Sequence, residues 1–210
     1  MGIIKQFFNN TRKPTSWMRK AMVSSMNQGH AAVSDCGLSH LQTSDITILS
    51  MIADFGCGGG RNTAELLKCF SSAAVKALDY SIADCNKTNH FNRYAVSTGR
   101  CQVIQADVSR VPFASETFEI ITAFETVYFW PGPLQSFQEV WRVLKPRERF
   151  LIVNEFDGID QARRKWTDMI EGMRVFTQEK MKRFLQDTGF SKITEYVNRK
   201  RHWLCILAKK

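Results

Sequence analysis

The chain has 210 residues, a formal net charge of +9, 44% hydrophobic residues and 23% charged residues. This length and composition suit one α/β domain with a full hydrophobic core. No apolar run approaches the length of a membrane span and the start lacks a signal-peptide layout, so we expect a cytoplasmic protein. The positive charge predicts attraction toward anions, which leaves nucleic acid, acidic lipid and a small anionic substrate open as partners.

Six cysteines are scattered along the chain, with no C-x-x-C pair and no clustered histidine partner. We therefore expect reduced thiols packed as small apolar groups, and neither a metal site nor a disulfide framework. The six are Cys36, Cys57, Cys69, Cys85, Cys101 and Cys205.

The stretch from Ile52 to Arg61 reads IADFGCGGGR, a buried strand that runs into a glycine-rich turn and opens a helix. Glycines in this turn remove the Cβ atoms, so a ligand can lie on the main chain and meet the free N–H groups of the helix. A dinucleotide fingerprint G-x-G-x-x-G that starts at Gly56 needs glycine or alanine at position 61, where the chain has Arg61. An NAD-dependent oxidoreductase is therefore disfavoured.

What remains is D-x-G-x-G-x-G headed by an aspartate, which resembles the first motif of class I S-adenosylmethionine (SAM) methyltransferases. The resemblance implies that the turn holds the methionine part of SAM and that the acidic residue acts near its amino group. The cofactor-binding residues implied here are Asp54, Gly56, Cys57, Gly58 and Gly60.

Two further predicted strands also end in acids. The carboxylate of Asp79 can accept hydrogen bonds from adjacent ribose hydroxyls, while Tyr80 is expected to pack on the adenosine and Ser81 to cap the next helix. The third strand, 101–105, leads into Ala106-Asp107-Val108. This triplet resembles the family position where a carboxylate accepts the adenine amino group beside apolar side chains.

A buried strand over 120–124 follows Pro112-Phe113 and Glu116-Thr117-Phe118-Glu119. This block resembles the methyltransferase family often called type 11, which includes the quinone-biosynthesis methyltransferases. In that family the end of strand four faces the methyl group, which implies a place at the cofactor for Glu125. No Asn or Asp followed by Pro-Pro-Tyr occurs here, so the signature for methylating exocyclic base nitrogens is absent.

Apolar residues spaced by three or four predict a core helix over 134–144 that Lys145-Pro146 ends, and then a fifth strand over 150–153. Most relatives turn here with Lys-Pro-Gly-Gly. This chain has Arg147-Glu148 after the proline, so the turn has to be made without glycine.

A further helix is predicted from Thr177 to Gly189, and strands around 193–197 and 203–207 read as a terminal hairpin. The alternation of strands and helices predicts a doubly wound α/β sheet. The family resemblance, over roughly residues 48–155, adds a Rossmann-like, mostly parallel sheet of seven strands with an antiparallel last strand.

Residues 1–45 resemble the N-terminal helical cap that small-molecule methyltransferases lay over the cofactor, and residues 46–210 form the SAM-binding domain in this interpretation. Such a cap would place His30 and Asp35 near the substrate. The other interpretation, that His30 and His40 are solvated loop residues, stays open.

The leading hypothesis is a SAM-dependent methyltransferase that acts on a small, partly apolar or anionic acceptor and releases S-adenosylhomocysteine (SAH). Methyl transfer is an in-line displacement, so the protein mainly aligns the reactants in a dry pocket. A base is needed only if the acceptor arrives protonated, and His30, Glu125 and Tyr128 are the candidates. Two alternatives remain: an RNA methyltransferase, prompted by the charge and the basic segment 198–201, and a non-catalytic SAM-binding protein of the same fold.

Overall fold

The computed structural model describes residues 31–41, 50–159, 167 and 170–210. Seven strands form one sheet: β1 (Met51–Phe55), β2 (Ala74–Asp79), β3 (Cys101–Gln105), β4 (Phe118–Phe124), β5 (Leu144–Asn154), β6 (Ser191–Asn198) and β7 (Trp203–Lys209). The described helices are α3 (Ala31–Leu38), α4 (Arg61–Cys69), α5 (Ile82–Phe91), α6 (Arg93–Ser97), the 3-10 helix η1 (Val127–Phe129), α7 (Pro133–Val143) and α9 (Gln178–Thr188).

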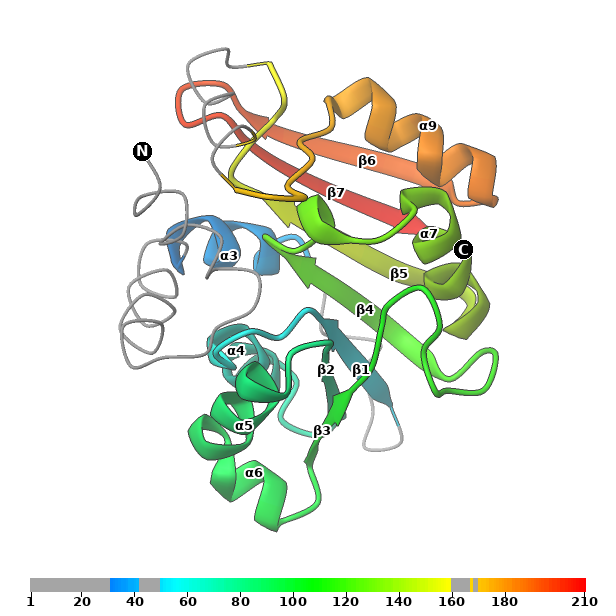
Figure 1. The fold of residues 1–210 in the computed structure, drawn as a ribbon. Coiled ribbons are helices and arrows are strands. Elements are labelled where there is room, and N and C mark those ends of the chain that lie inside the picture. The colour runs from blue at the N-terminus through cyan, green and yellow to red at the C-terminus, as the bar shows by residue number, and fades with distance from the viewer. Residues whose placement is uncertain (1–30, 42–49, 160–166, 168–169) are drawn as a thin grey trace.

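The strand order is β3-β2-β1-β4-β5-β7-β6 (Figure 1). β7 runs antiparallel to β5 and to β6, and the other neighbouring pairs are parallel. The prediction of a doubly wound, mostly parallel seven-stranded sheet with an antiparallel last strand is confirmed. The order reverses between β1 and β4, and in such sheets a ligand binds beside this switch point, at the carboxyl ends of the strands.

The sheet is buried on both faces because helices cover each side (Figure 1). Successive side chains of a strand point to opposite faces. Ile121 accordingly packs in the cluster that α7 and α9 complete, while Ile120 packs in the cluster completed by α3 and α4. Both isoleucines are fully buried. The described helices include none that is long and apolar enough to cross a membrane.

The predicted ends of the last helix and the terminal hairpin are confirmed. The Thr177 hydroxyl accepts the Lys180 N–H at 3.3 Å and caps α9, and Gly189 ends the helix at φ 104°. The hairpin is β6 and β7. Of the cap expected over residues 1–45, the structure describes only residues 31–41.

The turn expected after Lys145-Pro146 is instead an irregularity inside β5, which begins directly where α7 ends. Arg147 takes the left-handed conformation, with φ 68°, that glycine would adopt most easily. Its N–H donates to the carbonyl of Lys210 at 3.1 Å, and the Lys210 N–H donates to the carbonyl of Glu148 at 3.0 Å. Backbone pairing with Lys210 thus holds this left-handed conformation without a glycine.

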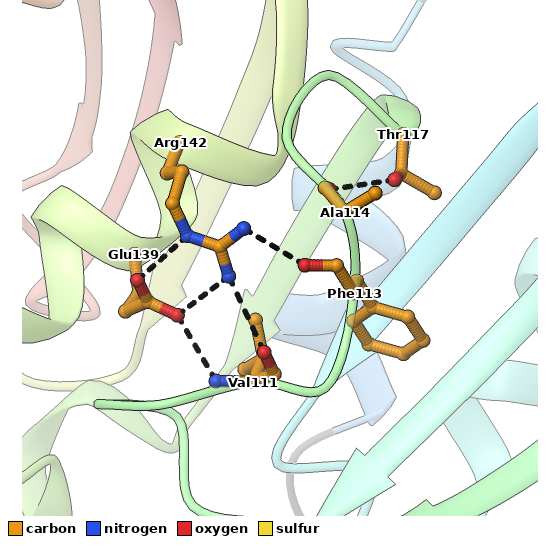
Figure 2. Close-up of polar contacts among 6 residues, drawn as sticks. All are labelled: Val111, Phe113, Ala114, Thr117, Glu139 and Arg142. Atoms are coloured by element: carbon orange, nitrogen blue, oxygen red, sulfur yellow. Dashed lines mark hydrogen bonds and ion pairs between the residues drawn. The ribbon is translucent and has the colours of Figure 1, made fainter.

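Residues 106–117 are all described, and they connect β3 to β4 without a helix. Two side chains of α7 hold this loop (Figure 2). Arg142 donates to the carbonyls of Phe113 at 2.8 Å and Val111 at 3.3 Å, and Glu139 accepts the Val111 N–H at 3.0 Å. The two side chains also pair with each other at 2.8 Å, and hydrogen bonding from Arg142 lowers the pKa of Glu139.

Replacing Arg142 with methionine should lower the free energy of unfolding by about 1–3 kcal/mol, because two loop carbonyls and a carboxylate lose a charged donor. Urea denaturation measures this loss. Lys68→Met is the control, since Lys68 forms an exposed pair with Glu65 at 2.8 Å and the same helical spacing. Its loss should stay below about 0.5 kcal/mol. Equal losses in the two variants would contradict the role assigned to Arg142.

Candidate functional site

A cavity of about 260 Å³ lies at the carboxyl ends of β1, β2, β3 and β4, beside the switch point. The glycine turn forms one wall, and the ends of β2 and β3 continue it. The predicted cofactor residues that line the cavity are Gly56, Cys57, Gly58, Asp79, Tyr80, Ala106, Asp107, Val108 and Glu125. The other two, Asp54 and Gly60, lie behind this wall.

The three glycines of the D-x-G-x-G-x-G motif are needed for different physical reasons. A Cβ at position 56 would lie 2.0 Å from Oγ1 of Thr126, and one at position 60 would lie 2.8 Å from Cα of Thr88, so both positions are closed by packing. A Cβ at Gly58 would meet nothing within 4 Å, and this residue has φ +52°. Gly58 is therefore the glycine that leaves room in the cavity itself.

Helix α5 fixes the turn from behind. Thr88 Oγ1 donates to the carbonyl of Gly58 at 3.0 Å, and Asn92 Nδ2 donates to the carbonyl of Gly60 at 3.0 Å. Both side chains are buried. Sequence reasoning missed them, although two polar residues spaced by four on one helix are a signal for a common face.

The acid at the end of β1 is an interior group. Asp54 is 1% exposed and accepts hydrogen bonds from Thr63 at 2.6 Å and Thr122 at 3.2 Å. Burial raises the pKa of Asp54 to about 6, although these two hydroxyls lower it. Asp54 thus links β1, β4 and α4 through hydrogen bonds. It does not line the cavity, although the family resemblance implies that it acts near the amino group of SAM.

Asp79, at the end of β2, does face the cavity. Its carboxylate accepts the N–H of Ser81 at 2.9 Å and the N–H of Gly58 at 3.0 Å. Burial raises the pKa of Asp79 to about 6, the two N–H donors lower it, and the nearby carboxylates of Asp84 and Asp54 raise it further. The group ties the glycine turn to β2 and presents an acceptor to any ligand in the cavity.

The three predicted residues after β3, Ala106, Asp107 and Val108, all line the cavity, but they differ in how exposed they are to solvent. Val108 is buried, whereas Asp107 is exposed. One oxygen of Asp107 accepts both the N–H and the hydroxyl of Ser109, at 2.8 and 2.7 Å. An apolar surface and a carboxylate therefore lie next to each other, as the resemblance implies for adenine.

The structure describes two of the three candidate bases, and of these two only Glu125 lines the cavity. It has φ 57°, and its side chain accepts the N–H of Glu155. Tyr128 is 2% exposed, hydrogen-bonds with Glu125 and accepts the Phe156 N–H at 3.0 Å. Burial raises the pKa of Tyr128 well above its ordinary value, so the geometry supports a positioning role for it. His30 lies outside the described residues.

Helix α3 contributes a residue that sequence reasoning missed. Ser34 lines the cavity and is 1% exposed, and its hydroxyl has no hydrogen-bond partner among the described residues. Asp35, expected near the substrate, pairs with Arg61 at 2.5 Å, and Arg61 itself lines the cavity. The buried hydroxyl of Ser34 would gain a partner from a polar ligand.

Four of the six cysteines are buried, as predicted, whereas Cys36 is half-buried and Cys69 is exposed. The cysteines do not all lie apart from histidine. Cys36, His40 and Cys205 come together, and the His40 ring stacks on Tyr196, so this histidine is no solvated loop residue. Burial raises the pKa of Cys205 to about 12 and lowers the pKa of His40. Spacing along the chain could show only the Cys36–His40 pair, because Cys205 belongs to a distant strand.

Residues 53–152 match the family described as a methyltransferase domain. The matched segment, just under half of the chain, resembles a methyltransferase domain. Among curated relatives, cycloartenol-C-24-methyltransferase 1 from Oryza sativa subsp. japonica is 34% identical over 101 residues, which are 48% of this chain and 29% of that protein. The similarity thus spans less than a third of that relative's length.

Solved structures show the same fold. The Haloferax volcanii protein solved in complex with the Trm112 methyltransferase activator has a TM-score of 0.80 and 15% identity, with coverage of 92% of this chain and 95% of that one. Geranyl diphosphate C-methyltransferase from Streptomyces coelicolor A3(2), solved with Mg²⁺, geranyl-S-thiolodiphosphate and SAH, gives 0.75 and 13%, with coverage of 94% and 82%. The methyltransferase domain therefore has the class I methyltransferase fold.

Gly58→Ala should weaken binding of SAH at least tenfold, because the added methyl group enters the cavity. Gly99→Ala is the matched control, since Gly99 also has a positive φ, +77°, and open space at its Cβ position but does not line the cavity. Both changes place a side chain at positive φ, so their stability costs should be similar. Isothermal titration calorimetry measures the affinities. Equal SAH affinities in the two variants would remove Gly58 from the site.

The affinity for SAH should fall as the pH drops below about 6, the pKa of Asp79. Ribose hydroxyls donate to the ionised carboxylate, and protonation of Asp79 removes that acceptor. The dissociation constant should rise by up to about tenfold per pH unit for one such group. Asp79→Asn should bind more weakly and lose most of this dependence; an unchanged pH profile would show that another group titrates.

Proposed function

We propose that this chain binds SAM and transfers its methyl group to a small, partly apolar acceptor. The observation that carries the proposal is the cavity itself. It joins an open space over Gly58 to the carboxylate of Asp79 and to the hydroxyl of Ser34, which has no hydrogen-bond partner in the described part of the chain. The methyltransferase domain match and the class I fold support the same function. The whole protein's activity remains a proposal, since the matched segment is 29% of the curated relative.

The residues present fit this cofactor. Asp79 is placed to accept hydrogen bonds from ribose, Val108 and Asp107 offer an apolar surface and an acceptor for adenine, and Ser34 offers a hydroxyl to the amino-acid end. The main chain at Gly58 leaves the necessary space. When bound, SAM supplies a methyl group activated by its positive sulfur.

The far end of the cavity is aromatic, which favours an acceptor with apolar surface. Phe124, Phe129 and Trp130 line it, and the Trp130 indole N–H donates to Thr126 at 3.3 Å, which fixes the ring. Such a lining excludes water from the reacting groups and attracts a positive centre through the faces of its rings.

Glu125 stands at the same end of the cavity and is the group best placed to take a proton from an acceptor that must lose one. Its conformation is fixed by the Glu155 N–H and by Tyr128. Tyr128 therefore acts through Glu125 in this proposal.

If the acceptor loses a proton, Glu125→Gln should lower kcat by about 100-fold or more while the affinity for SAH stays within about twofold. Tyr128→Phe removes only the positioning hydroxyl and should lower kcat less, with a shifted pH profile. Steady-state kinetics with radiolabelled SAM separates the effects. An unchanged kcat in Glu125→Gln would mean that no base is needed at this position.

The first experiment is calorimetric titration of the full chain with SAM, SAH and NAD, followed by transfer of a labelled methyl group to sterol, prenyl, quinone and phenol acceptors. We expect binding of SAM and SAH without NAD, and transfer to at least one acceptor. Binding without transfer to any acceptor would favour the non-catalytic alternative. Failure to bind either sulfur ligand would overturn the proposal.

An RNA acceptor remains the second candidate because of the basic turn between β6 and β7. Arg199, Lys200 and Arg201 form this turn, and Arg201 lies over the Trp203 ring at 4.7 Å. Phosphate contacts weaken steeply with salt. Methyl transfer to RNA that declines with rising salt, and is lost when the three basic residues become glutamine, would favour this candidate over a small molecule.

A further inference from the structure

A row of paired residues crosses three strands on the face of the sheet that α3 covers. Val153 of β5 lies opposite Cys205 of β7, and Cys205 lies opposite Tyr196 of β6. Directly opposed residues of neighbouring strands point to the same face, so these three side chains form a continuous strip. All three belong to or pack against the apolar cluster that α3 helps to form.

Helix α3 approaches this strip very closely because it carries a glycine there. A Cβ on Gly37 would lie 2.3 Å from Cγ2 of Val153. The close approach brings the neighbouring Cys36 to Cys205. It also places the ring of His40, four residues after Cys36, on the ring of Tyr196. The ring centroids are 3.6 Å apart and the ring planes are 7° from parallel.

The result is a set of three ligand atoms from two distant parts of the chain. Sγ of Cys36, a ring nitrogen of His40 and Sγ of Cys205 all lie within 4.8 Å of one another. In a tetrahedral zinc site, bonds of about 2.3 Å to sulfur and 2.0–2.1 Å to nitrogen imply separations of about 3.5–3.8 Å between ligand atoms. A contraction of each separation by at most about 1.3 Å therefore completes the geometry.

We propose that Cys36, His40 and Cys205 form a binding site for a thiophilic metal ion of the Zn²⁺ type. Two thiolates and an imidazole favour such an ion over Mg²⁺ or Ca²⁺, which prefer oxygen ligands. Three protein ligands leave the fourth position to water or another ligand. Cys36 and His40 are only half-buried, so the ion has a route from solvent, while Cys205 anchors it to the sheet.

A bound ion would fix α3 to β7. The same helix carries Ser34, which lines the cavity, and Asp35, which pairs with Arg61 at 2.5 Å. A bound ion would therefore stabilise helix α3, which contributes to the cavity wall, although the three ligands themselves do not line the cavity. This role goes beyond the proposed methyl transfer and does not depend on SAM.

The test is titration of the reduced, metal-free full chain with Co²⁺, followed by displacement with Zn²⁺. We expect one equivalent to bind with sulfur-to-cobalt charge-transfer absorption and the visible bands of a tetrahedral ion. Cys36→Ser and Cys205→Ser should each lose most of the charge-transfer absorption, and His40→Ala should bind at least tenfold more weakly. Cys69→Ser, which removes an exposed thiol, and Cys101→Ser, which removes a buried one, should behave as the unaltered chain.

Hydrogen exchange gives an independent reading. Zn²⁺ should slow amide exchange in residues 31–41 of the unaltered chain and leave it unchanged in Cys36→Ser, the mildest of the ligand variants because its side chain is only half-buried.

The proposal is overturned if one equivalent of Co²⁺ gives no sulfur-to-cobalt absorption, or if that absorption persists in Cys36→Ser. It is overturned in favour of a redox pair if peptide mapping finds a Cys36–Cys205 disulfide and the reduced chain takes up no metal ion. Because Cys36→Ser is expected to fold, misfolding of Cys205→Ser would leave the test intact.

Discussion

The site depends on how tightly the glycine turn is held between its neighbours. The N–H groups of Gly56 and Cys57 both donate to the carbonyl of Leu78, at 2.7 and 3.0 Å, which joins the turn to β2. From the other side, Thr88 of α5 and Asn92, which caps the C-terminus of α5, donate to carbonyls of the turn. Because these hydrogen bonds fix the backbone of the turn, its conformation is already formed before a ligand binds. Binding therefore does not have to include the entropic cost of ordering the turn.

The acids at the strand ends show how much of the site can be predicted from the sequence alone. Periodicity and spacing correctly predicted three acids at the ends of three neighbouring strands, but their environments differ. Asp54 is enclosed by two threonine hydroxyls, Asp79 is held by two backbone N–H groups at the cavity wall, and Asp107 is exposed. Those differences arise from neighbouring strands and helices, so no local pattern could separate a bracing acid from a ligand-facing one.

Other features could not be predicted because they join distant segments. A spacing of four places Thr88 with Asn92 on a common face and Cys36 near His40, yet it does not say what each pair faces. The partners, the carbonyls of the turn and Cys205, become neighbours only through the sheet order. The turn at Arg147 is a similar case. It has no glycine, and its left-handed conformation is held by backbone hydrogen bonds with Lys210, which is distant in sequence but adjacent in space.

The left-handed backbone conformation of Glu125 has an energetic cost. A non-glycine residue in the left-handed conformation costs about 1–2 kcal/mol relative to its ordinary conformations, and glycine at this position would avoid that strain. The Glu125 N–H donates to the carbonyl of Val153 at 2.8 Å, which helps to impose the conformation. The fold thus tolerates local backbone strain at the residue that follows β4, and this strained residue is one whose side chain lines the cavity.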